Sequence, residues 1–332
     1  MNVLYQCDDN YAPFCGVSIT SLFENNKDIE TIHIYLLDDG ISDSNKRKFQ
    51  ECAQKYGRII EFVDTSSVVQ FLEENNMPKL RGSYTTWLKV FCVSRLGLKE
   101  GNLIYIDADT IVKSIKELEY LDMGDNCCGM VEAFEAFDYK KLAGLNIDKY
   151  FYAGMIVFDV ENYLNQDCEN EIINLISKKQ INFPFHEQDV LNFLFAKDNV
   201  YSLDLKYDYP YLYEEIIGFE SSKKVFNWPQ DFYEAVVENS KDGRIYHCIP
   251  TFGKRPWHEG CIASEKAQWD YYLSISEWND YQKQNIKIPI TIEIQKLMAK
   301  YLPSFIYNVI YRYRNIHFMK MAAKKWEQLD NF

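Results

Sequence analysis

The chain has 332 residues, of which 47% are hydrophobic and 26% charged, so it is neither a disordered nor a low-complexity protein. A formal net charge of −13 argues against nucleic acid as a partner. No apolar run approaches the roughly 18 residues of a transmembrane helix. Because Asp8 and Asp9 interrupt the first apolar stretch, we expect no secretory signal. The nine cysteines contain no C-x-x-C pair and predict reduced, structural thiols in a cytoplasmic protein.

Short apolar runs alternate with helical patterns along the chain. Helices are expected after Pro13 and over residues 42–56, 170–178 and 188–195, and strands over residues 3–7, 32–37, 59–63, 103–106, 128–131, 155–160 and 245–247. This alternation predicts an α/β fold with a mainly parallel, Rossmann-like sheet flanked by helices. We expect one such domain over residues 1–280 and a separate helical tail over residues 281–332.

The tail is basic and aromatic. Residues 294–326 contain seven Lys or Arg and no acid. After Pro303, one helical stripe is formed by Phe305, Ile306, Val309, Ile310, Tyr313 and Ile316. This pattern predicts a helix that lies on an anionic membrane leaflet. Docking on the acidic body of the protein and a dimer contact are the alternatives.

The strongest chemical signal is a pair of carboxylates, Asp107 and Asp109, directly after the apolar strand 103–106. In extended backbone, residues i and i+2 point the same way, so the two carboxylates converge. Converging carboxylates repel each other unless a cation lies between them, and hard oxygen ligands suit Mn²⁺ or Mg²⁺. An exposed turn without a metal is the structural alternative.

A second signal lies in the segment from His247 to Trp257, which contains Gly253, Lys254 and Arg255. A neutral imidazole can complete the coordination of a Mn²⁺ ion that carboxylates hold. Either cation is suited to phosphate oxygens, and the pattern leaves open which one takes that role. The alternative is an ordinary structural histidine.

These motifs together resemble the retaining glycosyltransferases of family 8, to which bacterial lipopolysaccharide galactosyl- and glucosyltransferases and glycogenin belong. The likeness extends over residues 1–260. Its motifs lie at residues 8–11, 36–42, 105–109, 121–126, 150–154, 188–192 and 247–257. Each motif is short, but their order and spacing together are specific.

The resemblance implies a GT-A fold, with Mn²⁺ or Mg²⁺ held by Asp107, Asp109 and His247. It implies transfer of galactose or glucose from a UDP-sugar to a surface-glycan acceptor, lipid-linked or protein-linked. The residues implied in nucleotide and donor binding are Asp8, Asn10, Tyr11, Lys89, Asp107, Ala108, Tyr152, Gly253, Lys254 and Arg255. Those implied beside the reacting carbon are Glu132, Glu187, Gln188 and Asp189. Related bacterial enzymes attach to the inner face of the plasma membrane through a basic, aromatic C-terminus, here residues 294–326.

Several positions depart from the family pattern. Tyr152 replaces an Asn that contacts the donor sugar, and a phenol cannot supply an amide's paired donor and acceptor. Lys89 replaces an Arg and loses its bidentate fork. Glu132 and Glu187 stand where Asp is common. The segment after His247 is two residues longer than usual. These changes leave the identity of the donor sugar open.

The same residues have plainer structural roles as alternatives. Asp8, Asp9 and Asn10 are suited to capping a helix, as are Gln188 and Asp189. Glu132 and Glu187 would then be solvated loop carboxylates.

For the reaction, we expect attack on the same face from which UDP leaves, because the amide of Gln188 is a poor nucleophile. Two other functions stay open. One is a relative that binds UDP-sugars but has lost catalysis, and the other is an aspartate-nucleophile phosphatase. The phosphatase motif fits poorly, because Ile111 stands at its fifth position and the pair lies far into the chain.

Overall fold

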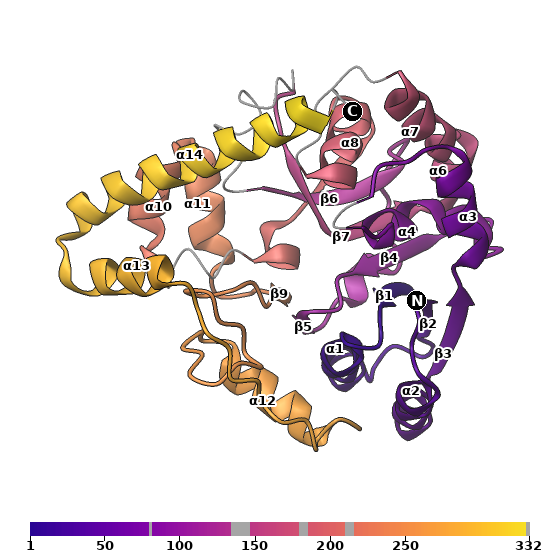
Figure 1. Ribbon diagram of the computed structural model, residues 1–332. Helices are drawn as coiled ribbons and strands as arrows, with labels where there is room; N and C mark the ends of the chain where they lie inside the picture. Colours follow the sequence, from indigo (N-terminus) through magenta and orange to yellow (C-terminus); the bar gives the residue numbers. More distant parts are fainter. Residues whose placement is uncertain (80–81, 134–146, 179–184, 210–215, 330–332) are drawn as a thin grey trace.

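The computed structural model describes residues 1–79, 82–133, 147–178, 185–209 and 216–329. Its main sheet has seven strands in the order β3-β2-β1-β4-β7-β6-β8 (Figure 1). They are β1 (Asn2–Cys7), β2 (His33–Asp38), β3 (Ile59–Asp64), β4 (Asn102–Ile106), β6 (Cys128–Glu132), β7 (Phe151–Asp159) and β8 (Val200–Leu203). The other adjacent pairs are parallel, but β7 runs antiparallel to both its neighbours. The predicted mainly parallel sheet is confirmed. The antiparallel direction of β7 could not be predicted, because an apolar run does not encode the direction of a strand.

Side chains alternate between the two faces of the sheet and form a hydrophobic core on each. Along β4, Ile104 and Ile106 belong to one core, while Leu103 and Tyr105 belong to the other. The first core is covered by α1 (Ala12–Asn25) and α2 (Asp43–Tyr56). The second is covered by α3 (Ser66–Glu74), α4 (Thr85–Phe91), α6 (Val160–Asn165), α7 (Cys168–Ser177) and α8 (His186–Phe195).

Local signals define both the start and the end of α2. The Ser42 hydroxyl accepts a hydrogen bond from the backbone N–H of Asn45 (3.4 Å), and Gly57 ends the helix at φ +62°. A side-chain N-cap and a left-handed glycine are common signals for the start and the end of a helix.

A small second sheet pairs β5 (Thr110–Val112) with β9 (Ile245–His247) in antiparallel fashion. Short 3₁₀ helices occur at η1 (Val93–Arg95), η2 (Lys116–Leu118) and η3 (Leu205–Asp208). The pairing of β5 with β9 ties the segment after β4 to the C-terminal part of the chain.

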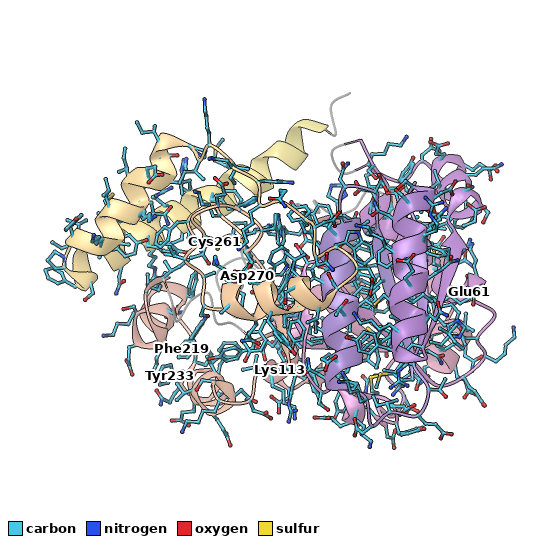
Figure 2. The ribbon with its side chains drawn as sticks, turned by 90° about the horizontal axis from the view of Figure 1, so that it is seen from below. Glu61, Lys113, Phe219, Tyr233, Cys261 and Asp270 are labelled. Carbon is cyan, nitrogen blue, oxygen red and sulfur yellow. The ribbon has the colours of Figure 1, made fainter. Side chains whose placement is uncertain are left out.

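The C-terminal part is helical, with α10 (Phe219–Phe226), α11 (Gln230–Asn239), α12 (Lys266–Ile275), α13 (Ile290–Tyr301) and α14 (Ser304–Leu329). Seen from below in Figure 2, α12, which carries Asp270, lies beside the helices of the N-terminal part. Figure 1 shows α14 running along α10. In the part of the chain that the structure describes, no helix has the length and apolar character to cross a membrane. The domain boundary near residue 280 stays a prediction.

Contacts between α14 and α10 anchor the last helix to the body. Tyr307 is buried, and the ring of Tyr311 meets that of Phe226 edge-on at 6.2 Å. Arg312 donates to the carbonyl of Lys224 (3.2 Å). The helix begins directly after Pro303, as the sequence predicts.

Candidate active site

The candidate site lies at the carboxyl edge of the sheet, where β1 and β4 end side by side. The two strands are parallel, with Leu4 opposite Tyr105, so the residues that follow them share one edge. A cavity of about 270 Å³ opens there. Its described lining residues are Gln6, Cys7, Asp8, Tyr11, Thr85, Tyr105, Asp107, Ala108 and Asp109. The N-terminal motif and the aspartate pair therefore line one cavity.

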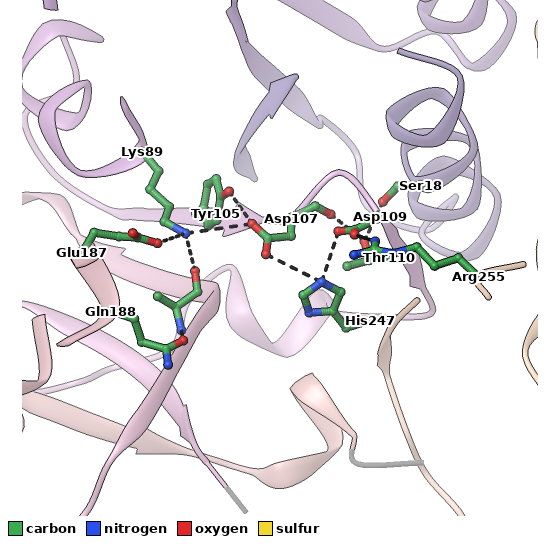
Figure 3. Close-up of polar contacts among 11 residues, drawn as sticks. Ser18, Lys89, Tyr105, Asp107, Asp109, Thr110, Glu187, Gln188, His247 and Arg255 are labelled. Carbon is green, nitrogen blue, oxygen red and sulfur yellow. Dashed lines mark hydrogen bonds and ion pairs between the residues drawn. The ribbon is translucent and has the colours of Figure 1, made fainter. Parts of the chain in front are cut away.

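The small sheet brings a third side chain to the aspartate pair. Thr110 of β5 is paired with His247 of β9. His247 Nε2 lies 3.1 Å from Asp109 Oδ1 and 3.8 Å from Asp107 Oδ2 (Figure 3). One ligand atom from each of these three residues lies within 4.8 Å of the other two. This spacing suits a single metal ion.

The backbone beside the cluster leaves room for such an ion. On β7, Gly154 accepts a hydrogen bond from the N–H of Asp107 (2.9 Å). A Cβ at Gly154 would lie 3.1 Å from Asp107 Oδ2 and 3.2 Å from His247 Nδ1. A side chain at this position would crowd both groups, and two carboxylates with an imidazole are ligands that Mn²⁺ accepts. The residues present therefore fit a divalent ion.

The charges of the cluster stabilise one another. Burial disfavours the His247 imidazolium, but Asp109 and Asp107 outweigh it and raise the His247 pKa to about 9. Burial likewise disfavours the Asp109 carboxylate, yet His247 and Arg255 hold the Asp109 pKa well below its usual range. The Arg255 guanidinium contacts Asp109 Oδ2 directly (Figure 3). With His247 protonated and Arg255 in contact with Asp109, positive charge lies beside the carboxylates that would hold a metal.

A second charged group adjoins Asp107 on the other side. Lys89 of α4 is buried, and its Nζ donates to the carbonyl of Ala153 (2.8 Å). The same Nζ lies 3.1 Å from Glu187 Oε1 and 4.0 Å from Asp107 Oδ1. Burial disfavours the Lys89 ammonium, but Glu187 and Asp107 outweigh it and raise the Lys89 pKa. Lys89 and Glu187, which are far apart in the sequence, thus contact each other.

That contact has a simple geometric reason. Lys89 presents a single ammonium, and the side chain of Glu187, one methylene longer than that of an aspartate, reaches it. Burial raises the Glu187 pKa, and Lys89 opposes this shift. The pair therefore places one cation and one carboxylate together inside the protein, next to the candidate metal site.

Polar contacts tie the start of α8 to β7. Gln188 Oε1 accepts from the N–H of Ala153 (3.0 Å), and its Nε2 donates to the Tyr150 hydroxyl (3.0 Å). That hydroxyl donates to Asp189 Oδ1 (2.6 Å), while Asp189 Oδ2 accepts from the N–H of Phe185 (2.8 Å). Asp189 is fully buried. Both of its oxygens are engaged, so it orients Gln188 and Tyr150 rather than facing solvent.

The sequence leaves open whether Lys254 or Arg255 contacts phosphate, and the structure gives these two side chains different partners. Arg255 reaches Asp109, whereas Lys254 Nζ donates to the carbonyl of Glu259 (2.6 Å). The backbone bridge between Thr251 and Lys254, with Gly253 at φ +78°, sets these directions. Sequence spacing could not reveal them, because they depend on the path of this loop.

The remaining predicted residues lie around the cavity or one strand away. Asp8 Oδ1 accepts from the N–H of Tyr11 (2.8 Å) and so closes this turn, but it does not cap α1, and it also lines the cavity. Asn10 is exposed in the same turn. Tyr152, two residues before Gly154, shares its face of β7. Glu132 ends β6 and lies 3.4 Å from Lys149.

Sequence reasoning missed four residues of the site: Thr85, Tyr105, Tyr150 and Gly154. Tyr105 donates to Asp107, and Thr85 donates to Asp39 Oδ2 (2.6 Å). All four stand inside or beside the motifs, but nothing in their residue type identifies them as contacts of the charged groups.

Comparison with known proteins gives a consistent result. The sequence model of glycosyl transferase family 8 matches residues 2–247. General stress protein A of Bacillus subtilis (strain 168) is 27% identical over 293 residues, which cover 84% of this chain and 95% of that protein. Lipopolysaccharide 1,2-glucosyltransferase of Escherichia coli (strain K12) is 24% identical over 293 residues, covering 86% of this chain and 81% of that protein.

A solved structure shares the fold. Galactosyltransferase LgtC, in complex with donor and acceptor sugar analogs, matches with a TM-score of 0.68 at 22% identity. The match covers 88% of this chain and 99% of that chain. The expected GT-A fold is confirmed, and a phosphatase is excluded. The chain belongs to glycosyltransferase family 8.

Proposed function

We propose that this glycosyltransferase is metal-dependent and retaining, and that it moves galactose or glucose from a UDP-sugar to a surface-glycan acceptor. The observation that carries the proposal is the Asp107–Asp109–His247 cluster, two of whose members, Asp107 and Asp109, line the cavity at the ends of β1 and β4. The relative from Escherichia coli (strain K12) is a lipopolysaccharide 1,2-glucosyltransferase. Its name supports a lipid-linked glycan as acceptor. The reaction would take place in the cytoplasm.

In the proposed complex, uridine occupies the cavity beside Asp8, Asn10 and Tyr11. Asp107, Asp109 and His247 would hold Mn²⁺ or Mg²⁺, and such an ion neutralises charge on a departing diphosphate. Arg255 leaves Asp109 for the phosphate oxygens, because a guanidinium matches phosphate geometry. We assign the phosphate role to Arg255 rather than Lys254 on this ground.

Retention proceeds by attack from the same face. The bond from the anomeric carbon to the phosphate oxygen breaks, the acceptor oxygen bonds that carbon, and its proton passes to the leaving phosphate. The burial of Asp189 supports this route, because its carboxylate is enclosed by the protein and held by hydrogen bonds from Tyr150 and Phe185. A glycosyl ester on Asp189 or Glu187, detected by mass spectrometry, would contradict it.

A thermal-shift series tests the function. UDP, UDP-galactose, UDP-glucose and UDP-N-acetylglucosamine are added with and without Mn²⁺. At a hundredfold excess over Kd, a ligand stabilises the fold by about 2.7 kcal/mol, so a clear rise in Tm is expected with UDP ligands and Mn²⁺ together. Asp109→Asn should lose the metal-dependent part. GDP is the control, and an equal rise with GDP would contradict the proposal.

A catalytically weakened relative is the second candidate, because Tyr152 replaces the usual donor-sugar amide. Release of UDP from the donor in the presence of Mn²⁺ separates the two. Turnover supports the enzyme, and donor binding without turnover supports the weakened relative.

We also propose peripheral contact with the inner face of the plasma membrane through residues 294–326. Phe305, Val309 and Tyr313 are exposed on one face of α14, opposite Tyr307. Lys296, Lys300 and Arg312 supply positive charge nearby. Exposed apolar residues flanked by cations suit an anionic leaflet.

A further inference from the structure

At Arg255 the chain enters a tight reverse turn that His258 closes with two hydrogen bonds. The N–H of His258 donates to the carbonyl of Arg255 (2.9 Å), and the N–H of Arg255 donates to His258 Nδ1 (3.0 Å). Pro256 occupies the second position of this turn, which its fixed φ favours. One bond through the backbone and one through the imidazole therefore fix the backbone from which the Arg255 guanidinium extends.

The bond to the imidazole depends on the protonation state of the ring. It requires a neutral ring with its hydrogen on Nε2, because a protonated Nδ1 cannot accept. Burial lowers the His258 pKa, and the positive charges of Arg255 and Lys254 lower it further. The ring is therefore neutral at pH 7, and Nδ1 is available as an acceptor.

The turn is anchored on two sides. Gln284 donates its N–H to the carbonyl of Trp257 (3.0 Å) and accepts from the N–H of Glu259 (3.0 Å). The buried indole of Trp257 stacks on Phe14 at 4.1 Å, and Phe14 in turn meets Tyr11, which lines the nucleotide cavity. The turn therefore keeps a fixed position relative to the cavity in which uridine is proposed to lie.

The fixed turn limits how the Arg255 side chain can move. Its guanidinium carbon lies 5.3 Å from the ring centre of Trp257, and the guanidinium contacts Asp109 (Figure 3). In the proposed complex the same group moves to the phosphate oxygens. Holding a long side chain on a mobile backbone would cost additional conformational entropy on binding. With the turn in place, the guanidinium only has to rotate about its own side-chain bonds.

We propose that His258 is a positioning residue for the diphosphate, because its Nδ1 holds the backbone of Arg255 so that the guanidinium reaches the phosphate oxygens. The inference rests on the proposed function, since it assumes that Arg255 binds the phosphates. It predicts that His258 affects binding of the diphosphate part of the donor and leaves binding of the nucleoside part unchanged.

Binding of UDP, measured by calorimetry, and of uridine, measured by saturation-transfer NMR, tests this role on the full chain with Mg²⁺. His258→Leu removes the acceptor and should weaken UDP binding about tenfold, while uridine binding stays the same. His258→Asn should restore UDP affinity to within about twofold of the unaltered chain, because Asn Oδ1 takes the place of Nδ1 and accepts the same bond.

Two further variants separate positioning from a general structural role. In an Arg255→Gln background, His258→Leu should change UDP affinity little, because the guanidinium through which His258 acts is gone. His33→Leu is the matched control, since it makes the same substitution at the start of β2, on the edge of the sheet opposite the site. It should leave binding of both UDP and uridine unchanged.

The outcomes distinguish this inference from the proposed function. If UDP binds the unaltered chain no more tightly than uridine, or if Arg255→Gln leaves UDP binding intact, the proposed phosphate contact fails and this inference with it. If Arg255→Gln weakens UDP binding but His258→Leu does not, the positioning role alone is overturned. The same holds if His258→Leu weakens uridine binding equally, if His258→Asn restores nothing, or if the losses from His258→Leu and Arg255→Gln add.

Discussion

Asp107 lies between two charged groups of the site. On one side are Asp109, His247 and Arg255, and on the other are Lys89 and Glu187. Each group is held by contacts between residues far apart in the sequence. The residue types of the metal cluster could be predicted from the sequence because they follow strand ends. The contact between Lys89 and Glu187 could not, since each residue is plausible alone and only the fold joins them.

His247 should make metal binding depend on pH. Its pKa is raised to about 9 from an ordinary 6.5, so in the metal-free protein the imidazole carries a proton at pH 7. A metal ion binds only the neutral imidazole and must displace that proton. The Mn²⁺ affinity should therefore rise about tenfold per pH unit between pH 7 and 8. Calorimetry in buffers of different ionisation enthalpy should detect one proton released per ion.

The control for this measurement is His247→Gln. It keeps both carboxylates but has no titrating ring, so the slope and the released proton should both disappear. An equal slope in this variant would contradict the role given to His247.

Lys89 and Glu187 should be coupled in stability. Lys89→Met leaves a buried carboxylate without its cation, which typically costs about 3–5 kcal/mol. The double variant Lys89→Met with Glu187→Gln removes both charges, so its free energy of unfolding should fall by clearly less. Urea unfolding of the two single variants and the double variant gives the coupling energy. Additive losses would contradict the pairing.

At the scale of elements, α14 has two opposite faces. Tyr307 and Tyr311 pack toward α10, while Phe305, Val309 and Tyr313 are exposed, the last by 73%. Residues four apart form one stripe of a helix, so the periodicity predicted the exposed stripe. It did not predict which other residues dock, because the surface of α10 decides that. Helix α14 therefore packs against α10 through one face and exposes an apolar stripe on the other.

Removing the exposed stripe should abolish membrane binding without unfolding the protein. Deletion of residues 294–332 would uncover the surface of α10 that Tyr307 and Tyr311 contact, so point variants are the cleaner test. Phe305→Ser, Val309→Ser and Tyr313→Ser together should reduce co-sedimentation with phosphatidylglycerol vesicles at least tenfold, because each buried apolar side chain contributes about 1.5–3 kcal/mol.

Tyr120→Ser is the control for this experiment, since Tyr120 is 86% exposed at a distant turn. Sedimentation velocity of the triple variant shows whether the stripe instead joins two copies of the chain. Unchanged vesicle binding by the triple variant would contradict the proposed membrane contact.

At the scale of the whole molecule, much of the sheet and of helix α2 could be predicted from apolar periodicity and capping residues. Helices α10, α11 and α12 were not predicted, although Phe232 and Trp269 are buried. Their apolar residues are interspersed with charged and polar ones, so packing rather than local pattern defines them.

The thiols offer a test of the whole fold. All nine cysteines are free and buried. Burial raises the pKa of Cys52 to about 11 and that of Cys92 to about 12, which suppresses the reactive thiolate. With a thiol-specific chromogenic reagent at pH 8, the native protein should show almost no fast reaction, and the unfolded protein should show nine thiols. Several rapidly reacting thiols in the native state would contradict this packing.

The pairing of β5 with β9 has a consequence for synthesis. Asp109 and Arg255 are 146 positions apart, and His247 lies on the late strand β9, with Arg255 in the segment that follows it. A nascent chain still on the ribosome already contains the aspartates, but it lacks the imidazole and the guanidinium until β9 and that segment have emerged. An unfinished polypeptide therefore cannot assemble the cluster of Asp107, Asp109 and His247 until translation is nearly complete.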